Sequence, residues 1–267
     1  MTALGRAIAA EFSKTFSTRM WWLLLVILAG YVGIAAAGIA LALTLAPESA
    51  GTDLTGIDVA PIVYSMATAS GFVFPLILGA LSVTSEVRHR TLSTTFLATP
   101  HRWMVLVAKL VVGLLIGALY GVVASTATVG LGALSLGAAG ADTQLGKPET
   151  WTLIACMVLA MAIWAVVGVG IGVLIPNQVA SIVAILAFTQ FVEPIVRTAA
   201  AFVEPIATVA RYLPGAASDA LVGASFYSAF GSETEALEWW QGGLVLAGYG
   251  ILFLVVGART FWRRDVT

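Results

Sequence analysis

Long apolar runs dominate the pattern of hydrophobic and polar positions along the chain. A helix needs about 20 mainly apolar residues to cross the ~30 Å hydrocarbon core of a bilayer. The runs that qualify as spans cover residues 21–45, 62–81, 103–135, 151–175 and 240–258. The third of these runs is longer than a bilayer requires, so we expect part of it to tilt or to project beyond the membrane.

A further run, residues 179–192, has only 14 residues and stops at Glu193-Pro194. At about 1.5 Å per residue it is too short to cross a bilayer alone. We expect it to be the fifth span in chain order, with its outer end completed by another segment. The pattern therefore predicts a single all-α domain, residues 1–267, with six transmembrane helices.

The segment after the short run contains a repeat. Phe191-Val-Glu193-Pro194-Ile195 recurs as Phe202-Val-Glu204-Pro205-Ile206. Each Glu-Pro can place the proline at the first helical position and the acid at the positive end of a helix. This predicts a broken span followed by re-entrant helices within residues 193–238, with Glu193 and Arg197 spaced to pair. An ordinary outer loop with a chance repeat is the alternative.

The first 19 residues have a different pattern. Apolar side chains recur every four residues, and the polar side chains between them are Arg6, Glu11 and Lys14. This spacing predicts a helix, residues 1–19, that lies flat at the membrane interface, with a frayed tail as the alternative. The following apolar run is longer than the 7–15 residues of a signal-peptide core, so no cleaved signal peptide is expected. The stripe consists of Leu4, Ile8, Phe12 and Phe16.

The distribution of charge predicts the orientation. If both termini are cytoplasmic, ten of the 13 Lys and Arg residues lie on the cytoplasmic side, as the positive-inside rule requires. Tryptophans at the span ends match an aromatic belt. The ten basic residues are Arg6, Lys14, Arg19, Arg88, Arg90, Arg102, Lys109, Arg259, Arg263 and Arg264.

Composition agrees with lipid as the solvent. Hydrophobic residues make up 60% of the chain and charged residues 10%, whereas soluble domains carry about 25% charged residues. The net charge of −1 is uninformative as a total, and we expect no nucleic-acid partner for a chain whose solvent is lipid. The single Cys156 excludes an internal disulfide and a cysteine-based metal cluster.

Small residues at four-residue spacing mark two of the predicted spans. Such stripes let helix backbones approach closely in a membrane. They predict packing within the bundle, with a dimer seam as the alternative. The third span carries Gly113, Gly117 and Gly121, and the fourth carries Gly168 and Gly172.

The chain lacks the residues of common membrane enzymes. Its two histidines, His89 and His101, both lie in the loop between the second and third spans, which argues against intramembrane haem or zinc. There is no Gly-x-Ser-x-Gly elbow. The only Gly-Lys pair, Gly146-Lys147, precedes Pro148, so a phosphate-binding loop is absent. We expect no catalytic, metal or cofactor site, and a source of energy outside this chain.

The loop between the second and third spans, residues 84–102, is longer than a turn between antiparallel helices requires. Leu92 and Phe96 form an i, i+4 apolar pair on a short helix among basic and hydroxyl-bearing residues. Such a helix suits docking into a groove of a soluble partner. A solvated basic loop that only enforces topology is the alternative.

The same loop resembles the signature of type-2 ATP-binding-cassette permeases. In that family a Glu-Tyr-Arg-His/Asn-Gly-Thr-like motif opens the loop, and Thr-Pro or Ser-Pro before a basic residue closes it. Here the sequence reads Glu86-Val-Arg-His-Arg90-Thr91 and then Thr99-Pro-His-Arg102, with Val87 for the usual aromatic residue and Arg90 for the usual glycine. The ending Phe261-Trp-Arg-Arg-Asp-Val266 after the sixth span also resembles the family, as does Arg211-Tyr-Leu-Pro214 ahead of that span.

The resemblance implies a permease subunit without its own ATPase site. Residues 85–102 would form the coupling helix that contacts a separate ATPase subunit, present in two copies and carrying ATP and Mg²⁺. A second permease chain, in a homodimer or with a sister subunit, would complete an exporter in a bacterial cytoplasmic membrane. The apolar spans suit a hydrophobic drug, peptide or lipid as the substrate, and a permease of this family could also move a glycan.

The resemblance also assigns roles to particular residues. The polar docking groups would be Glu86, Arg88, His89, Arg90 and Thr91, and the apolar anchors Leu92 and Phe96; a local Glu86–Arg90 pair is the alternative for Glu86. Re-entrant helices would close the outer end of the pathway, and these contain Glu193, Pro194, Arg197, Glu204 and Pro205.

Three other functions remain open at the level of sequence. An ion-coupled secondary transporter would work without an ATPase, but its spans usually hold carboxylates near the midplane. A non-transporting scaffold or immunity protein would bind a ligand without moving it. A polytopic enzyme has the least support, because no nucleophile, metal site or carboxylate pair converges in the spans.

Overall fold

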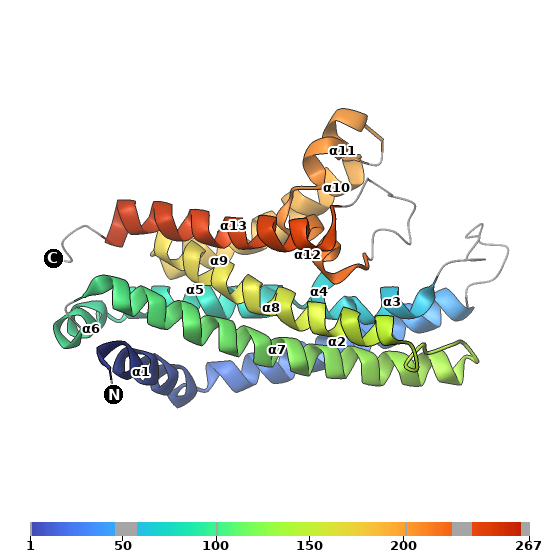
Figure 1. Cartoon of the computed structure of the whole chain (residues 1–267), viewed down its shortest axis with the longest axis horizontal. Helices are drawn as coiled ribbons and strands as arrows, with labels where there is room; N and C mark the ends of the chain where they lie inside the picture. The colour runs from blue at the N-terminus through green and yellow to red at the C-terminus, as the bar shows by residue number, and fades with distance from the viewer. Residues whose placement is uncertain (1, 46–57, 100, 201, 226–236, 263–267) are drawn as a thin grey trace.

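The computed structural model describes residues 2–45, 58–99, 101–200, 202–225 and 237–262. Every regular element in these ranges is helical, and six helical segments are long and apolar enough to cross a membrane. The expectation of an all-α chain with six helices long and apolar enough to cross a membrane is therefore confirmed for the described residues. The long helices form an elongated bundle (Figure 1). Of the motifs singled out in the sequence, Arg263–Val266 lies outside the described residues.

Four spans match their apolar runs to within a few residues. Their ends follow from local chemistry: Pro148 opens α8, and Glu238 with Gln241 forms a capping box before α13. The helices are α2 (Met20–Leu45), α7 (Arg102–Ala138), α8 (Pro148–Leu174) and α13 (Trp239–Gly257).

The second span is interrupted. It consists of α3 (Val59–Tyr64), α4 (Met66–Ala69) and α5 (Val73–Arg88). Gly71 lies in the break before α5, where a Cβ atom would come within 2.9 Å of Val32 Cγ1 and 3.0 Å of Leu28 Cδ1. The missing side chain therefore lets this part of the chain lie directly against α2.

Helix α8 lies at the centre of the bundle, in contact with α5, α7 and α13. Its glycines and those of its neighbours occupy these contacts. A Cβ atom on Gly117 would lie 2.7 Å from Ala165 Cβ of α8, and one on Gly172 would lie 2.7 Å from the Ala80 carbonyl oxygen of α5. Gly113 and Gly121 likewise face α8, and Gly168 faces Leu76 of α5. Both glycine stripes therefore lie in helix contacts within the chain: the stripe of α7 packs against α8, and the stripe of α8 packs against α5.

The fifth span differs from the prediction that it breaks at Glu193-Pro194. It continues from Gln178 to Ala200, through α9 (Gln178–Ala187), a π-helical turn (Phe188–Val192) and α10 (Glu193–Ala200). Proline has no N–H and crowds the preceding turn, and a π-helical turn is one way in which a helix accommodates an irregular site. Prolines do begin the next two helices, α11 (Glu204–Ala210) and α12 (Pro214–Val222).

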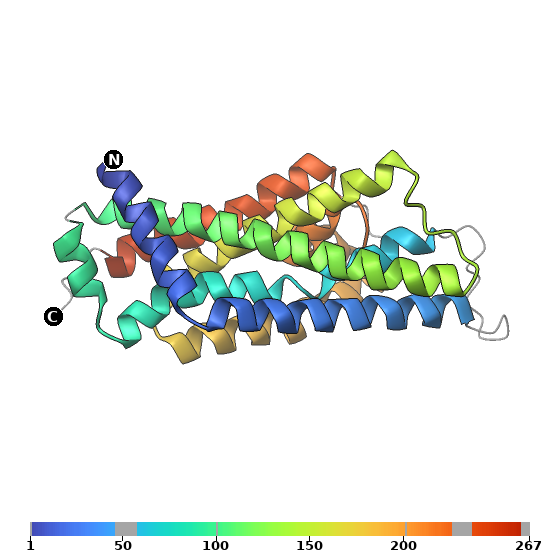
Figure 2. The same cartoon turned by 90° about the horizontal axis from the view of Figure 1, so that it is seen from below.

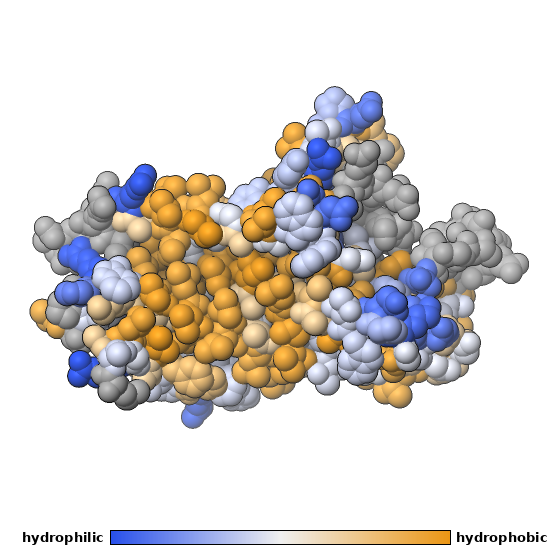
Figure 3. All heavy atoms as spheres, in the orientation of Figure 1, coloured by the Kyte–Doolittle hydropathy of each residue, from blue (hydrophilic) through white to orange (hydrophobic). Residues whose placement is uncertain are grey.

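The surface agrees with a membrane setting. Figure 3 shows a broad apolar band over the middle of the bundle, with polar residues gathered at both ends. At one end, α1 (Ala3–Ser17) packs across α7 and α6 (Leu92–Ala98) lies beside it (Figures 1 and 2). The charged residues considered next lie at this end.

Candidate functional site: a charged cluster and a cavity at one end of the bundle

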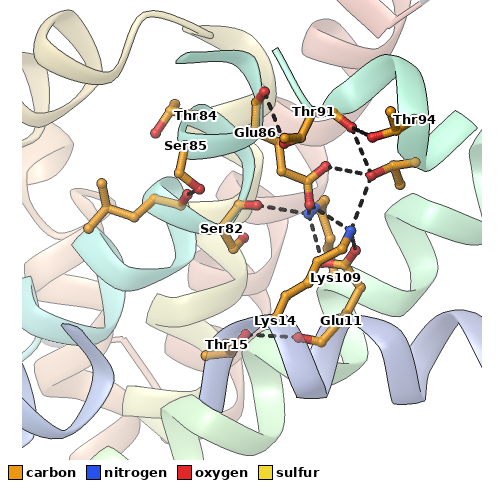
Figure 4. Close-up of polar contacts among 12 residues, drawn as sticks. Glu11, Lys14, Thr15, Ser82, Thr84, Ser85, Glu86, Thr91, Thr94 and Lys109 are labelled. Atoms are coloured by element: carbon orange, nitrogen blue, oxygen red, sulfur yellow. Dashed lines mark hydrogen bonds and ion pairs between the residues drawn. The ribbon is translucent and has the colours of Figure 1, made fainter. Parts of the chain in front are cut away.

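Four charged side chains from three helices meet where α1 crosses the bundle (Figure 4). Lys109 of α7 is at the centre, with a fully buried side chain. Its Nζ lies 2.7 Å from Glu11 Oε2 of α1 and 2.8 Å from Glu86 Oε1 of α5, and it donates to the Ser82 carbonyl oxygen at 2.8 Å. We call Glu11, Lys14, Glu86 and Lys109 the charged cluster.

Lys14 closes the cluster and adds α6 to it. Its Nζ donates to Glu11 Oε1 at 2.6 Å, to Glu86 Oε1 at 2.9 Å and to Thr95 Oγ1 of α6 at 3.2 Å. An ammonium group has three donors, so both lysines use their full capacity. The cluster is electrically neutral, and it ties α1, α5, α6 and α7 together.

Pairing explains why these charges are tolerated. A buried charge is costly unless it is paired and hydrogen-bonded. Burial alone would lower the pKa of Lys14, but the carboxylates of Glu11 and Glu86 outweigh it and hold that pKa above its ordinary value of 10.5. The ammonium therefore stays charged at neutral pH, and its contribution to stability is lost only as the pH rises through this elevated pKa.

The sequence placed Glu86 in a docking surface or in a pair with Arg90. The structure places it in the charged cluster, where the residue is 7% exposed, while Arg90 is exposed to solvent. Lys109 and Glu11 were not singled out from the sequence as site residues. The available signal was a lysine and a glutamate within otherwise apolar helical faces. Lys109, however, is 23 residues from Glu86 and 98 residues from Glu11 along the chain, so the sequence does not show that they meet.

The motif around Glu86 ends α5 in a defined way. The Thr91 N–H donates to the Glu86 carbonyl oxygen at 2.9 Å, and the Arg90 N–H donates to the Val87 carbonyl oxygen at 3.2 Å. These two bonds form a Schellman motif, in which the residue after the C-cap is left-handed and usually glycine. Arg90 occupies that position with φ of 56°. The usual glycine of the resembling signature therefore falls where the backbone favours glycine.

Helix α6 turns its two predicted anchors toward the bundle. Leu92 is 2% exposed and packs with Val83 and Val105, and Phe96 is half-buried under the Arg102 guanidinium. By contrast, Leu97 is 82% exposed. An i, i+4 pair shares one helical face, and in α6 that face meets the rest of the chain. The exposed residues of this loop and helix include Arg88, His89, Arg90, Thr91 and Leu97.

A cavity of about 680 Å³ adjoins the charged cluster. Its walls come from α1, α5, α7, α8 and the starts of α2 and α9. Glu86, Arg88 and Lys109 line one part, and Pro75, Ile116 and Ala165 line another. The cavity is therefore polar at the end of the bundle and apolar farther in.

A second polar group lies where α10 meets α12. Glu193 Oε1 accepts hydrogen bonds from the Gly215 N–H at 2.6 Å and the Ala216 N–H at 3.2 Å, at the start of α12. Arg197 forms an ion pair with Asp219 of α12, because its Nη2 lies 2.6 Å from Asp219 Oδ2. Glu204 and Pro205 are exposed on α11 and belong to neither group.

Comparison of the chain with models of known protein families gives no match, and comparison with curated proteins gives none either. The fold and the site define the class as far as a multi-pass helical membrane protein.

Proposed function

We propose that this chain is the permease subunit of an ATP-binding-cassette exporter in a bacterial cytoplasmic membrane. Two such permease chains, as a homodimer or with a sister subunit, would assemble with two ATPase subunits that hold ATP and Mg²⁺. Both termini would be cytoplasmic, α1 would lie at the membrane interface, and α11 and α12 would re-enter the outer leaflet. The exported molecule would be a hydrophobic drug, peptide or lipid.

The observation that supports this proposal most is the attachment of α6 to the spans. Thr95 of α6 contacts Lys14 of α1 and Glu86 of α5, and Glu86 contacts Lys109 of α7. A force on α6 is therefore delivered to α1, α5 and α7 together. A permease that borrows energy from a soluble ATPase needs such a link, because the nucleotide acts only by biasing a two-state element elsewhere.

The burial of Leu92 and the exposure of Arg90 and Leu97 indicate which residues suit a test of ATPase docking. Substitution of Leu92 or Phe96 by a charged residue would disturb packing inside the chain. Arg90 and Leu97 are exposed at the end of the bundle, so their substitution leaves the internal contacts in place. We therefore assign the ATPase contact to the exposed face formed by His89, Arg90, Thr91 and Leu97.

Affinity purification of the tagged chain from its native membrane tests the proposal. We expect the wild type to copurify with a protein that contains a Gly-x-x-x-x-Gly-Lys-Ser/Thr loop. The variant Arg90→Glu/Leu97→Asp should lose that protein, whereas Arg6→Glu, a charge reversal at an exposed position of α1, should retain it. Absence of any such ATPase from a correctly inserted wild type would contradict the proposal.

One observation favours a second candidate, an ion-coupled secondary transporter. Glu193 lies in the fifth span and is 3% exposed, and its Oε2 has no hydrogen-bond partner among the described residues. Carboxylates within spans often belong to proton or ion pathways. Transport that stops on addition of an uncoupler but continues without the ATPase would favour this candidate over the exporter.

A further inference from the structure

The cavity beside the charged cluster has the form of a binding site for one amphipathic molecule. Along α5 its lining extends from Pro75 to Arg88, which at 1.5 Å per residue corresponds to about 20 Å. One leaflet of a bilayer has a hydrocarbon thickness of about 15 Å, half of ~30 Å. The volume of about 680 Å³ falls in the ~300–1,000 Å³ range of small-molecule sites.

The polarity of the lining changes along this length. Farthest from the end of the bundle it is formed by Pro75, Leu78 and Ile116, and at the end it is formed by charged and hydroxyl-bearing side chains. A molecule with an apolar tail and a polar head matches this gradient. A uniformly apolar molecule would displace the water that solvates these polar side chains without replacing its hydrogen bonds, at a cost in desolvation.

The charges at the polar end favour an anionic head. Lys14 and Lys109 have their three donors satisfied within the charged cluster, and they balance Glu11 and Glu86. Arg88 also lines the cavity and forms no ion pair with any described residue. Its Nη1 donates to Gln178 Oε1 at 3.3 Å, and a guanidinium has five N–H donors. The excess charge at this end is therefore positive.

We propose that the cavity binds a single-chain lipid with a phosphate head, with its acyl chain along α5 and α7 and its phosphate at Arg88. The site lies within one chain and needs no second copy. Binding at this site is independent of the proposed exporter function. The further step, that such a lipid is the exported molecule, rests on that function.

Photolabelling of the purified full-length chain in phosphatidylcholine nanodiscs tests the proposal. The probe is a lysophosphatidylglycerol that carries a diazirine in its acyl chain. We expect saturable labelling of peptides from α5 and α7, displaced by unlabelled lysophosphatidylglycerol. Displacement by the uncharged monoacylglycerol of the same chain length should be about tenfold weaker, because a charge-assisted hydrogen bond is lost.

Two pairs of variants locate the site. Arg88→Gln should weaken saturable labelling by about tenfold, whereas Arg90→Gln, two residues away and outside the cavity lining, should not change it. Leu78→Trp should abolish the saturable component by filling the apolar part. Leu115→Trp, at an exposed position of α7 outside the lining, should retain it.

The other outcomes overturn the proposal. Displacement by free glycerophosphate as strong as by the lysolipid would make the site one for a soluble phosphate compound. Equal displacement by monoacylglycerol, or labelling unaffected by both Arg88→Gln and Leu78→Trp, would show only annular lipid. No ATPase takes part in this measurement, so its failure and the failure of the exporter proposal are separate results.

Discussion

Arg90 has a left-handed backbone at the end of α5, in a position that favours glycine. A non-glycine residue in this conformation costs about 1–2 kcal/mol. Glycine avoids this strain, but its larger conformational entropy in the unfolded chain offsets part of the gain. We therefore expect Arg90→Gly to stabilise the protein by up to about 1 kcal/mol. The measurement is the free energy of unfolding in detergent.

Arg88→Gly, in the last right-handed turn of α5, is the control and should destabilise by about 1 kcal/mol. Equal destabilisation by both would refute the Schellman assignment.

The charged cluster yields a second prediction at this scale. Lys109→Met leaves two buried carboxylates with Lys14 alone, and removal of one partner from a buried ion pair typically costs about 3–5 kcal/mol. The double variant Glu86→Gln/Lys109→Met should recover part of this loss, because it restores charge balance. Unfolding of the single and double variants measures the coupling.

The exposed Lys147 provides the control for the cluster, because Lys147→Met removes the same charge from the surface. Its unfolding free energy should change by less than about 0.5 kcal/mol. If Lys109→Met unfolded as the wild type does, the cluster would not hold the helices together.

Residue pairing was the part of the site that the sequence predicted least well. The patterns around residues 84–102 located the right segment, since local motifs and a helical pair are visible over a few residues. The partner of Glu86 depends on how α1 and α7 pack, which no local pattern specifies. The sequence also did not show where the Leu92 side chain packs, because an apolar i, i+4 pair is equally suited to the core of its own chain and to a groove of a partner.

At the scale of elements, the glycine contacts of α8 carry a prediction. A Cβ atom on Gly117 would come within 2.8 Å of Ala162 Cα and of the Met161 carbonyl oxygen, which are backbone atoms that cannot turn aside. Gly117→Val should therefore separate α7 from α8 and destabilise by about 3 kcal/mol or more. On the same helix, Gly130 has no atom within 4 Å of its Cβ position, so Gly130→Val should be tolerated.

Thermal unfolding monitored by circular dichroism compares the two valine variants. Similar midpoints for Gly117→Val and the wild type would contradict close packing of α7 on α8. Loss of stability in Gly130→Val to the same extent would point instead to a general effect of valine in α7.

The spans were predictable because most of them are long apolar runs. In lipid, a single segment can satisfy all its backbone hydrogen-bonding groups internally only as an α-helix. The fifth span was predicted less well. Glu193-Pro194 is a helix-start signal in water, but here the π-helical turn before it carries the helix onward to Ala200. Glu193 then bonds to the start of α12 instead of opening its own helix. That contact joins residues 22 positions apart along the chain, and local rules do not include it.

At the scale of the whole molecule, the central claim is that force from a soluble ATPase enters the spans through α6 and the charged cluster. The exposed side chain of Leu97 lies on the proposed contact, and the single native cysteine, Cys156, lies in α8. A Cys156→Ser background therefore leaves one reactive site when a new cysteine is introduced. The control position is Leu134, which is also exposed. It lies near the C-terminal end of α7, whereas α6 lies just before the N-terminal end of that helix.

Crosslinking of Leu97→Cys in native membranes tests this claim most directly. A short photoactivatable crosslinker on that cysteine should capture a protein with an ATP-binding phosphate loop, and ATP should change the yield of the crosslink. Leu134→Cys should capture no such protein. An inserted Leu97→Cys protein that gives no ATPase crosslink with or without ATP would contradict the claim that α6 is the coupling element.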